Sequence, residues 1–281
     1  MKEQVWIVSG ASRGIGKAIA REALCSGHKV AAGVRQLDDV MDLVSEFGEA
    51  CLPVRMDMTQ VDTLKSSVNQ AVKQWGRVDV LINNAGYGLW GMMEELSMEQ
   101  IRHQMEVNFF GLVALTRFVV PLMRQQQSGF IANVSSLAGL RGMQGLSAYN
   151  ASKFAVEGFT EALAQEMAYF KVRVCVVEPG PYRTDWAGNS LVKTPELKAL
   201  DVNSPYHELN QVAARRISMS DGKQPGNPVQ IAKVLLEAAA APVVPLHMLF
   251  GDVCIEGWEQ RKARLSDPEF MSYYPHEKNT L

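Results

Sequence analysis

A tyrosine and a lysine four residues apart, Tyr149 and Lys153, have the types and the spacing of an acid–base pair. They lie in the stretch SAYNASKFAVEGF, whose pattern predicts the start of a long helix. Residues four apart share one face of a helix, so the lysine cation would stand beside the phenol and favour its ionised form. The same spacing recurs in YPHEK, from Tyr274 to Lys278, beyond the last apolar run. Spacing alone does not select the pair, and the elements around each tyrosine must do so.

Composition and charge narrow the class of protein. The chain of 281 residues suits one large α/β domain or two small ones. Its hydrophobic content of 47%, charged content of 21% and net charge of −2 favour neither nucleic acid nor an anionic membrane as a partner. The N-terminal MKEQVWIVSG has only a short apolar run, so we predict no signal peptide. The apolar segment VLLEAAAAPVVPLHMLF is too interrupted by charge and proline to span a bilayer.

The cysteines and histidines indicate neither a metal site nor a disulfide framework. The four cysteines are far apart and match no metal or redox spacing, so we expect small core residues in a reducing, cytoplasmic compartment. The histidines are scattered at positions 28, 103, 207, 247 and 276, which disfavours a metalloenzyme. A hydrolase is also disfavoured, because no Gly-x-Ser-x-Gly occurs.

Short apolar runs alternate with longer helical patterns along the chain. Such near-continuous runs are typical of strands that are covered on both faces. We predict seven strands, at 5–9, 29–34, 51–56, 78–83, 130–135, 172–178 and 245–250. Helix start signals lie between them: Ser97 with Gln100, Thr59 with Asp62, and Asn227 before a proline.

Alternating strands and helices predict a single Rossmann-like doubly wound sheet of about seven parallel strands, with helices on both faces. We expect one domain over 1–281. Two regions break the rhythm: 180–226 reads as an insertion over a substrate site, and 251–281 as a polar C-terminal tail.

A glycine-rich turn follows the first predicted strand. In doubly wound sheets the ligand lies beyond the carboxyl ends of the strands. The turn, SGASRGIGKAI, has Gly10, Gly14 and Gly16, which let the backbone approach a pyrophosphate. The helix that begins near Gly14 would point its free N–H groups and positive dipole end at that anion. The spacing is Gly-x-x-x-Gly-x-Gly, which differs from the Gly-x-Gly-x-x-Gly fingerprint.

At this point the chain resembles the compact branch of the short-chain dehydrogenase/reductase family. Five further motifs follow in the family's order and at the expected strand ends: NNAG (83–86), VNFFG (107–111), NVSSLAG (133–139), YNASK (149–153) and PGPYRT (179–184). The resemblance covers residues 5–185 closely. Tyr149 follows Ser136 by 13 residues, which is the family's usual separation, whereas no serine loop precedes Tyr274. The resemblance thus selects Tyr149 and Lys153.

The resemblance implies interconversion of a carbonyl and an alcohol with a nicotinamide cofactor that carries the hydride. It gives four catalytic residues: Asn108, Ser136, Tyr149 and Lys153. Tyr149 would donate the proton, and lowering a tyrosine pKa from about 10 by about 3 units requires roughly 4 kcal/mol, which Lys153 would supply. Ser136 would stabilise the developing charge on the carbonyl oxygen. Asn108 matches the asparagine that kinks its helix and holds a water in the proton relay.

Charge at the end of the second strand predicts the cofactor. An acidic residue there binds the ribose of NAD, while an arginine accommodates the phosphate of NADP. Here Val34 takes the acidic position, Arg35 follows it, and Arg13 adds a second cation. Asp38 and Asp39 could replace the missing acid, but we expect them to cap the next helix. We therefore predict NADP(H).

The cofactor-binding residues that the turn, the charges and the resemblance predict are Gly10, Ser12, Arg13, Gly14, Ile15, Gly16, Arg35, Asp57, Asn84, Ala85, Gly86, Tyr149, Lys153, Pro179, Gly180 and Thr184. In the family, Asn83 belongs to the same segment as Ala85 and Gly86. One departure is Tyr182, where the family often has isoleucine or valine, and Pro181 removes a backbone donor.

The expected substrate is a bulky apolar carbonyl or alcohol. The loops over the site carry nine candidate residues, which are Tyr87, Trp90, Met92, Met93, Leu140, Met143, Leu146, Tyr182 and Trp186. Many of them could serve only to pack the loops. The PLHMLF run and Arg35 resemble the branch that holds hydroxysteroid dehydrogenases and carbonyl reductases.

The partner expected from the resemblance is a second copy of the chain, in a homodimer or homotetramer paired through the helices at 97–125 and 148–170. Two other functions stay open. One is an NADP(H)-sensing protein on the same fold. The other is an epimerase or dehydratase, although those relatives usually have a different glycine spacing.

Overall fold

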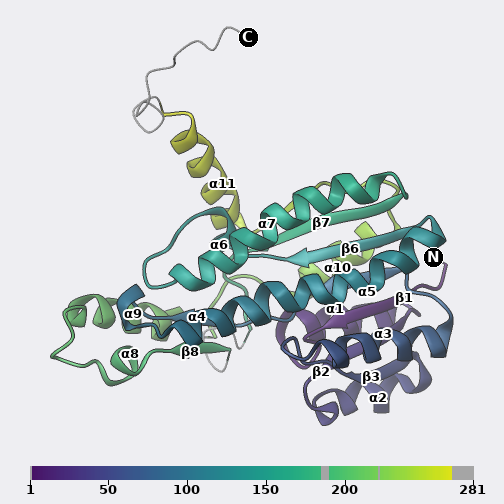
Figure 1. Cartoon of the computed structure of the whole chain (residues 1–281), viewed down its shortest axis with the longest axis horizontal. Coiled ribbons are helices and arrows are strands. Elements are labelled where there is room, and N and C mark those ends of the chain that lie inside the picture. The colour runs from purple at the N-terminus through teal and green to yellow at the C-terminus, as the bar shows by residue number, and fades with distance from the viewer. Residues whose placement is uncertain (1, 185–189, 221, 268–281) are drawn as a thin grey trace, which may run out of the picture.

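A parallel sheet of seven strands forms the centre of the protein (Figure 1). The computed structural model describes residues 2–184, 190–220 and 222–267. The strand order is β3-β2-β1-β4-β6-β7-β9, and every neighbouring pair is parallel. The bounds are β1 Val5–Ser9, β2 Lys29–Val34, β3 Cys51–Arg55, β4 Val80–Asn83, β6 Gly129–Val134, β7 Val172–Pro179 and β9 His247–Phe250. The predicted fold class is confirmed.

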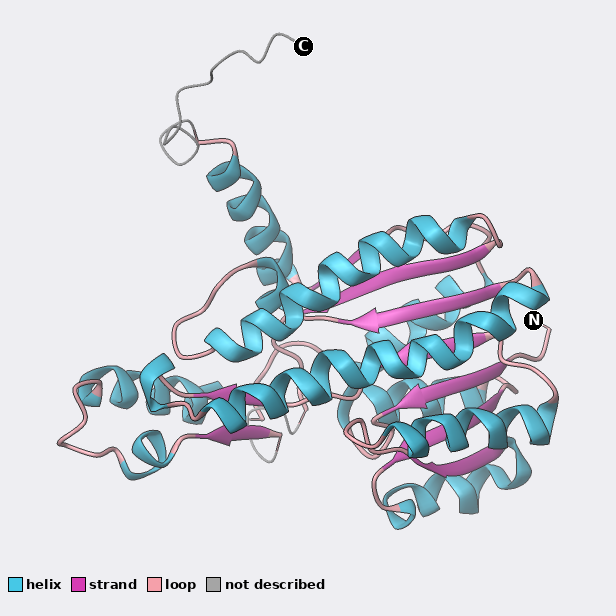
Figure 2. Cartoon of the chain, viewed as in Figure 1, coloured by secondary structure: helices cyan, strands magenta, loops and turns pink. Residues whose placement is uncertain are grey.

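Helices cover both faces of this sheet (Figure 2). On one face the core joins the strands to α1 (Gly14–Cys25), α2 (Met41–Phe47) and α10 (Pro228–Ala240). On the other it joins them to α3 (Val61–Trp75), α5 (Gly111–Gln126) and α7 (Ser147–Ala168). Because successive side chains of a strand alternate between the faces, both faces need apolar residues. The buried runs of β1 and β6 supply them.

Two of the three predicted helix starts are confirmed. The Ser97 Oγ accepts a hydrogen bond from the Gln100 N–H at the start of α4 (Met98–Met105), and Gln100 bonds back to Ser97. Asn227 caps α10 by accepting from the Val229 N–H. The prediction for Thr59 is wrong: α3 begins one residue later, and the Thr59 hydroxyl donates to Asp57 at 2.8 Å instead.

Asp38 and Asp39 also do not cap a helix. They lie inside a 3₁₀ turn, η1 (Leu37–Val40), whose N-cap position is Gln36. Two further 3₁₀ turns are η2 (Gly48–Ala50) and η3 (Met93–Glu95).

The region predicted as an insertion forms a layer of its own beside the sheet. It contains β8 (Leu191–Lys193), α8 (Pro195–Ala199) and α9 (His207–Ser220), drawn in green at the left of Figure 1. β8 pairs in parallel with β5 (Gly88–Trp90), about 100 residues earlier. Glu95 fastens this layer, because its Oε1 accepts from Ser204 Oγ at 2.7 Å and from Asn210 Nδ2 at 3.0 Å.

Within the predicted tail, the structure describes one helix, α11 (Asp252–Leu265), which stands away from the sheet in Figure 1. This helix packs on α6 (Leu137–Leu140). Arg261 Nη1 donates to the Gly139 carbonyl at 3.2 Å, and Arg141 Nη1 donates to Gln260 Oε1 at 2.9 Å. Tyr274 and Lys278 lie outside the described residues.

One continuous helical stretch, Met98–Gln126, is by length and composition apolar enough to cross a membrane, with a mean hydropathy of 1.4. It comprises α4, a π-helical segment η4 (Glu106–Phe110) and α5. In the fold it packs against α3 and α7. Core helices of globular proteins meet the same hydropathy criterion.

Candidate functional site

A cavity of about 880 Å³ lies at the carboxyl ends of β1, β2, β4, β6 and β7. Most of the predicted site residues line it: Gly10, Ser12, Arg13, Gly14, Ile15, Arg35, Asp57, Asn84, Ala85, Gly86, Ser136, Tyr149, Lys153, Pro179, Gly180 and Thr184. Gly16 and Asn108 do not line the cavity. Segments far apart in the sequence thus meet at one edge of the sheet, as a doubly wound sheet requires.

The glycine-rich turn is held against β4 at very short range. A Cβ at Gly16 would lie 2.2 Å from the Gly10 carbonyl oxygen, so only glycine fits there. Gly10 and Gly14 have φ of +69° and +58°, a conformation that glycine adopts without strain. Asn84 Nδ2 donates to the carbonyls of Ser9 at 3.0 Å and Gly10 at 3.2 Å. Asn84 therefore holds the backbone of the turn through two hydrogen bonds and also lines the cavity.

This turn fits the pyrophosphate of a dinucleotide. Arg13 occupies the N-cap position of α1 in an extended conformation, and its side chain makes no capping hydrogen bond. The first N–H groups of α1 are therefore available to an anion in the cavity. Gly14 also brings the backbone against Thr184, since a Cβ there would lie 3.3 Å from the Thr184 side chain.

Positive and negative side chains that bear on the choice between NADP(H) and NAD(H) lie at the end of the cavity formed by β2 and β3. Arg13 and Arg35 are exposed and line it. Asp39 lines it too, while Asp38 does not. Burial acts to raise the pKa of Asp57, but hydrogen bonds from Thr59 and the charges of Arg35 and Arg55 hold that pKa below its usual value. Asp57 is thus ionised near neutral pH at this end of the cavity.

Tyr149, Lys153 and Ser136 all line the cavity. Tyr149 and Lys153 are each 5% exposed, one turn apart on α7, with Lys153 Nζ 5.8 Å from the centre of the tyrosine ring. Lys153 Nζ donates to the Val134 carbonyl at 2.9 Å. Burial lowers the pKa of Lys153 to about 8, and the charge of Glu157 opposes that change. Ser136 accepts from the Ala138 N–H at 3.1 Å at the start of α6, so the bond occupies its oxygen and not its hydrogen.

Asn108 lies behind this group, in the π-helical segment. Its side chain is 1% exposed and bridges the Tyr87 backbone: Oδ1 accepts from the Tyr87 N–H at 3.0 Å, and Nδ2 donates to the Tyr87 carbonyl at 3.0 Å. Nδ2 also lies 3.1 Å from Ser152 Oγ. A π-helical turn is frequent at functional sites. Asn83 lies deeper still, where Nδ2 donates to Asn133 and Thr116 in the core.

Only some of the residues predicted to surround the substrate line the cavity. Tyr87, Trp90, Met143, Leu146 and Tyr182 line the cavity, whereas Met92, Met93 and Leu140 do not. Trp186 lies outside the described residues. Further lining residues were not predicted from the sequence, among them Leu89, His103, Ser190, Val192, Gln224 and Val253. Those of β8 and α11 carry no local signal, because they reach the cavity only through long-range pairing.

A parallel doubly wound sheet, a glycine turn at its first strand and a tyrosine–lysine pair in the same cavity together define a dinucleotide-dependent oxidoreductase. Residues 4–194 match the family described as short chain dehydrogenase. The chain belongs to the short-chain dehydrogenase/reductase family, whose members use a nicotinamide cofactor.

Relatives and solved structures agree with this. The chain is 38% identical over 254 residues to "Oxidoreductase BOA17" of Botryotinia fuckeliana, covering 90% of each chain. It is 36% identical over 251 residues to "Retinol dehydrogenase 8" of Bos taurus, covering 86% of this chain and 79% of the relative. A short-chain dehydrogenase from Streptomyces avermitilis superposes with a TM-score of 0.85 at 30% identity, over 97% and 98% of the two chains. A short-chain dehydrogenase/reductase from Burkholderia phymatum, in complex with NAD, superposes with a TM-score of 0.81 at 24% identity, over 99% of this chain and 98% of that chain.

Proposed function

We propose that the protein transfers hydride between NADP(H) and the carbonyl or secondary alcohol of a bulky apolar substrate, with Tyr149 as general acid and base. The observation that carries this proposal is the joint placement of Tyr149, Lys153 and Ser136 in one cavity with the glycine turn. When bound, the nicotinamide supplies the hydride. The protein supplies position, proton and charge.

Each of the three residues has one task in the reduction. The Ser136 hydroxyl donates a hydrogen bond to the substrate carbonyl oxygen and stabilises the charge that develops there. Tyr149 gives its proton to the same oxygen. Lys153, anchored on the Val134 carbonyl, keeps a positive charge beside the phenol and favours its ionised product. In alcohol oxidation Tyr149 takes the proton instead. Asn108 acts through Tyr87, by fixing the loop that borders the cavity.

Charge supports NADP(H) rather than NAD(H). Arg35 and Arg13 are the cations at the β2 end of the cavity, and arginine binds phosphate through two parallel hydrogen bonds. Two observations support NAD(H), the alternative cofactor. The similar structure from Burkholderia phymatum is in complex with NAD, and Asp39 lines the cavity of this protein.

The apolar residues at the other end support a bulky apolar substrate. Leu89, Trp90, Met143, Leu146 and Val192 share that wall. One relative is named a retinol dehydrogenase, and retinol is a long apolar alcohol. We further propose a homodimer or homotetramer in the cytoplasm.

The test is NADPH consumption over a panel of ketones and aldehydes graded in size and polarity. We expect turnover that Tyr149→Phe abolishes, while the matched variant Tyr274→Phe retains it. Unchanged turnover in Tyr149→Phe would refute the assignment. NADPH binding without turnover of any carbonyl, or of alcohols with NADP, would favour the sensor function.

A further inference from the structure

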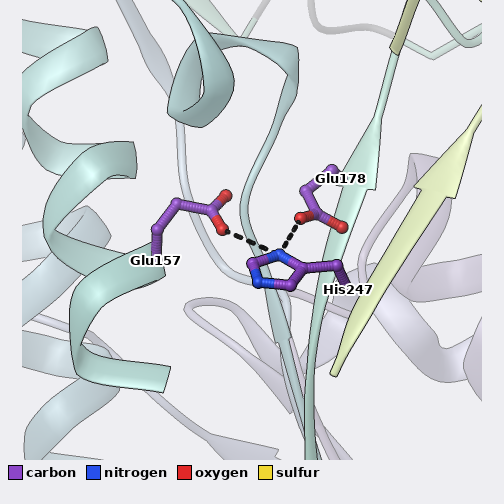
Figure 3. Close-up of side chains that lie close together, drawn as sticks. All are labelled: Glu157, Glu178 and His247. Atoms are coloured by element: carbon purple, nitrogen blue, oxygen red, sulfur yellow. Dashed lines mark hydrogen bonds and ion pairs between the residues drawn. The ribbon is translucent and has the colours of Figure 1, made fainter. Parts of the chain in front are cut away.

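Three ionisable side chains from three different elements lie close together (Figure 3). Glu157 comes from α7, Glu178 from the end of β7 and His247 from the start of β9. The Glu178 carboxylate is 0% exposed and Glu157 is 5% exposed. His247 Nδ1 lies 2.7 Å from Glu178 Oε1 and 3.7 Å from Glu157 Oε2. We call these three residues the acid cluster.

The register of the sheet explains why these residues meet. In the β7–β9 pairing His247 lies opposite Val176, so it shares a face with Glu178 two residues further on. That is the face that α7 covers, since Val174 packs in the same core cluster as Leu163 and Met167. Glu157 therefore points from the helix onto the two side chains of the sheet.

The acid cluster touches the segments that form the catalytic site. Glu157 follows Lys153 by one turn of α7, and its charge acts on the pKa of that lysine. A Cβ at Gly139 would lie 2.4 Å from Ser135 Oγ and 2.5 Å from Glu157 Oε1, so the serine loop passes directly over the carboxylate. Glu178 immediately precedes the Pro179–Gly180 turn of the cavity wall.

The distance between His247 Nδ1 and Glu178 Oε1 is that of a hydrogen bond, in which the two side chains share one proton. Nitrogen and oxygen at 2.7 Å make a hydrogen bond. Two ligands on one tetrahedral zinc ion, each at about 2.0–2.1 Å, would lie about 3.3 Å apart. Three side-chain oxygens, both of Glu157 and Oε2 of Glu178, have no hydrogen-bond donor within the described residues. Two buried carboxylates cannot both remain charged without a proton or a cation between them.

Burial raises the pKa values of both carboxyl groups in the acid cluster. Burial and the neighbouring Glu178 raise the pKa of Glu157 to about 7, and burial raises that of Glu178 to about 8. The other titratable groups near it are Glu161 and Lys153 on α7 and Cys254 on α11, while Cys175 lies on the opposite face of β7. Trp258 covers His247, with ring centres 5.1 Å apart.

We propose that Glu157 is a positioning residue for Lys153: its carboxylate, held among Ser135, Glu178 and His247, keeps the lysine charged and so sets the pH above which turnover falls. The proposal rests on the function proposed above. Glu157 lies one turn after Lys153 on α7, and both side chains are buried. Burial raises the pKa of Glu157 and lowers that of Lys153, so the carboxylate charge should act on the lysine at neutral and alkaline pH and be absent at low pH.

The test compares wild type, Glu157→Gln and Glu161→Gln. Glutamine has the shape of the protonated acid, so Glu157→Gln should match wild type below about pH 6.5. Above pH 7 its alkaline loss of kcat should begin about one pH unit earlier, because an opposite charge nearby shifts a pKa by 1–3 units. Glu161, with a side chain 53% exposed and 3.8 Å from His247 Nε2, is the matched control and should follow wild type.

A second measurement needs no substrate. The ¹³Cε resonance of Lys153, assigned with Lys153→Arg, should titrate near pH 8 in wild type and about one unit lower in Glu157→Gln. An equal loss of rate at every pH, or an unshifted lysine titration, would overturn the proposal. Turnover retained in Tyr149→Phe would refute the proposed function, while the lysine titration still reports the coupling by itself.

Discussion

Replacing Gly16 by alanine should damage both the fold and cofactor binding. The new Cβ would lie 2.2 Å from the Gly10 carbonyl oxygen and 2.4 Å from Asn84 Nδ2, whereas real Cβ atoms almost never come closer than 3.0 Å. The nearest obstacle is backbone, and α1 is packed against β1, β2 and α10, so neither side can retreat freely. Overpacking of this kind costs about 1–3 kcal/mol, and the strain on the Asn84 hydrogen bonds adds about 1 kcal/mol in total. We expect the free energy of unfolding to fall by roughly 2–4 kcal/mol.

The assay is urea unfolding together with kcat/KM for NADPH. Moving the turn by most of an ångström should lower kcat/KM by about 100-fold. Gly158→Ala is the matched control, because its Cβ would meet nothing within 4 Å in the exposed middle of α7. That variant should gain about 0.5–1 kcal/mol from helix propensity. Wild-type stability and wild-type kcat/KM in Gly16→Ala would refute the reasoning, since the helix and turn would then not be in rigid contact.

Three other perturbations test other parts of the site. Arg35→Ala should weaken NADPH binding by about 10–100-fold and leave NADH binding unchanged, as measured by fluorescence titration; equal losses for both cofactors would contradict the phosphate assignment. Gly145→Ala should raise KM for large apolar substrates more than for small ones, because its Cβ would lie 2.3 Å from Trp90 Nε1 and its φ is +77°; an unchanged ratio would show that Trp90 does not shape the pocket. The pKa of Glu178 is raised to about 8 by burial, so the folded state keeps a proton that the unfolded chain loses above about pH 4.3. Stability should then fall as the pH rises from about 4.5 to 8, by up to about 1.4 kcal/mol per unit, and Glu178→Gln should flatten that slope in urea titrations.

Local patterns predicted the sheet well because its strands are buried on both faces. β1 and β2 have the bounds that their apolar runs predicted, at 5–9 and 29–34. The positions of Gly10, Arg35, Asn84 and Ser136 follow because each comes within two residues of the end of a strand, and the carboxyl ends of parallel strands share one edge. In such a fold, position along the chain nearly determines position in the site.

Features that depend on long-range pairing could not be predicted from the sequence. β5 and β8 are three residues each, and neither GLW nor LVK reads as a strand until the two are paired. Thr59 is not a cap because α3 begins at Val61 with Gln60 at its N-cap position, and the Thr59 hydroxyl donates to Asp57. Of the acid cluster, only Glu178 left a trace in the sequence, as a charge inside the buried run VRVCVVE.

The acid cluster gives β9 and α11 contacts that lead toward Lys153 and Ser136. β9 and α11 lie at the far edge of the sheet from the glycine turn and follow every family motif in the sequence. Yet His247 shares a hydrogen bond with the glutamate just before Pro179, and Arg261 bonds to the Gly139 carbonyl in the serine loop. A substitution of His247 or Arg261, neither of which lines the cavity, should therefore act on the charge or the position of the proposed catalytic residues. Because their contacts lead to Lys153 and Ser136 rather than to the phosphate end, such variants should change kcat and its pH dependence more than cofactor affinity.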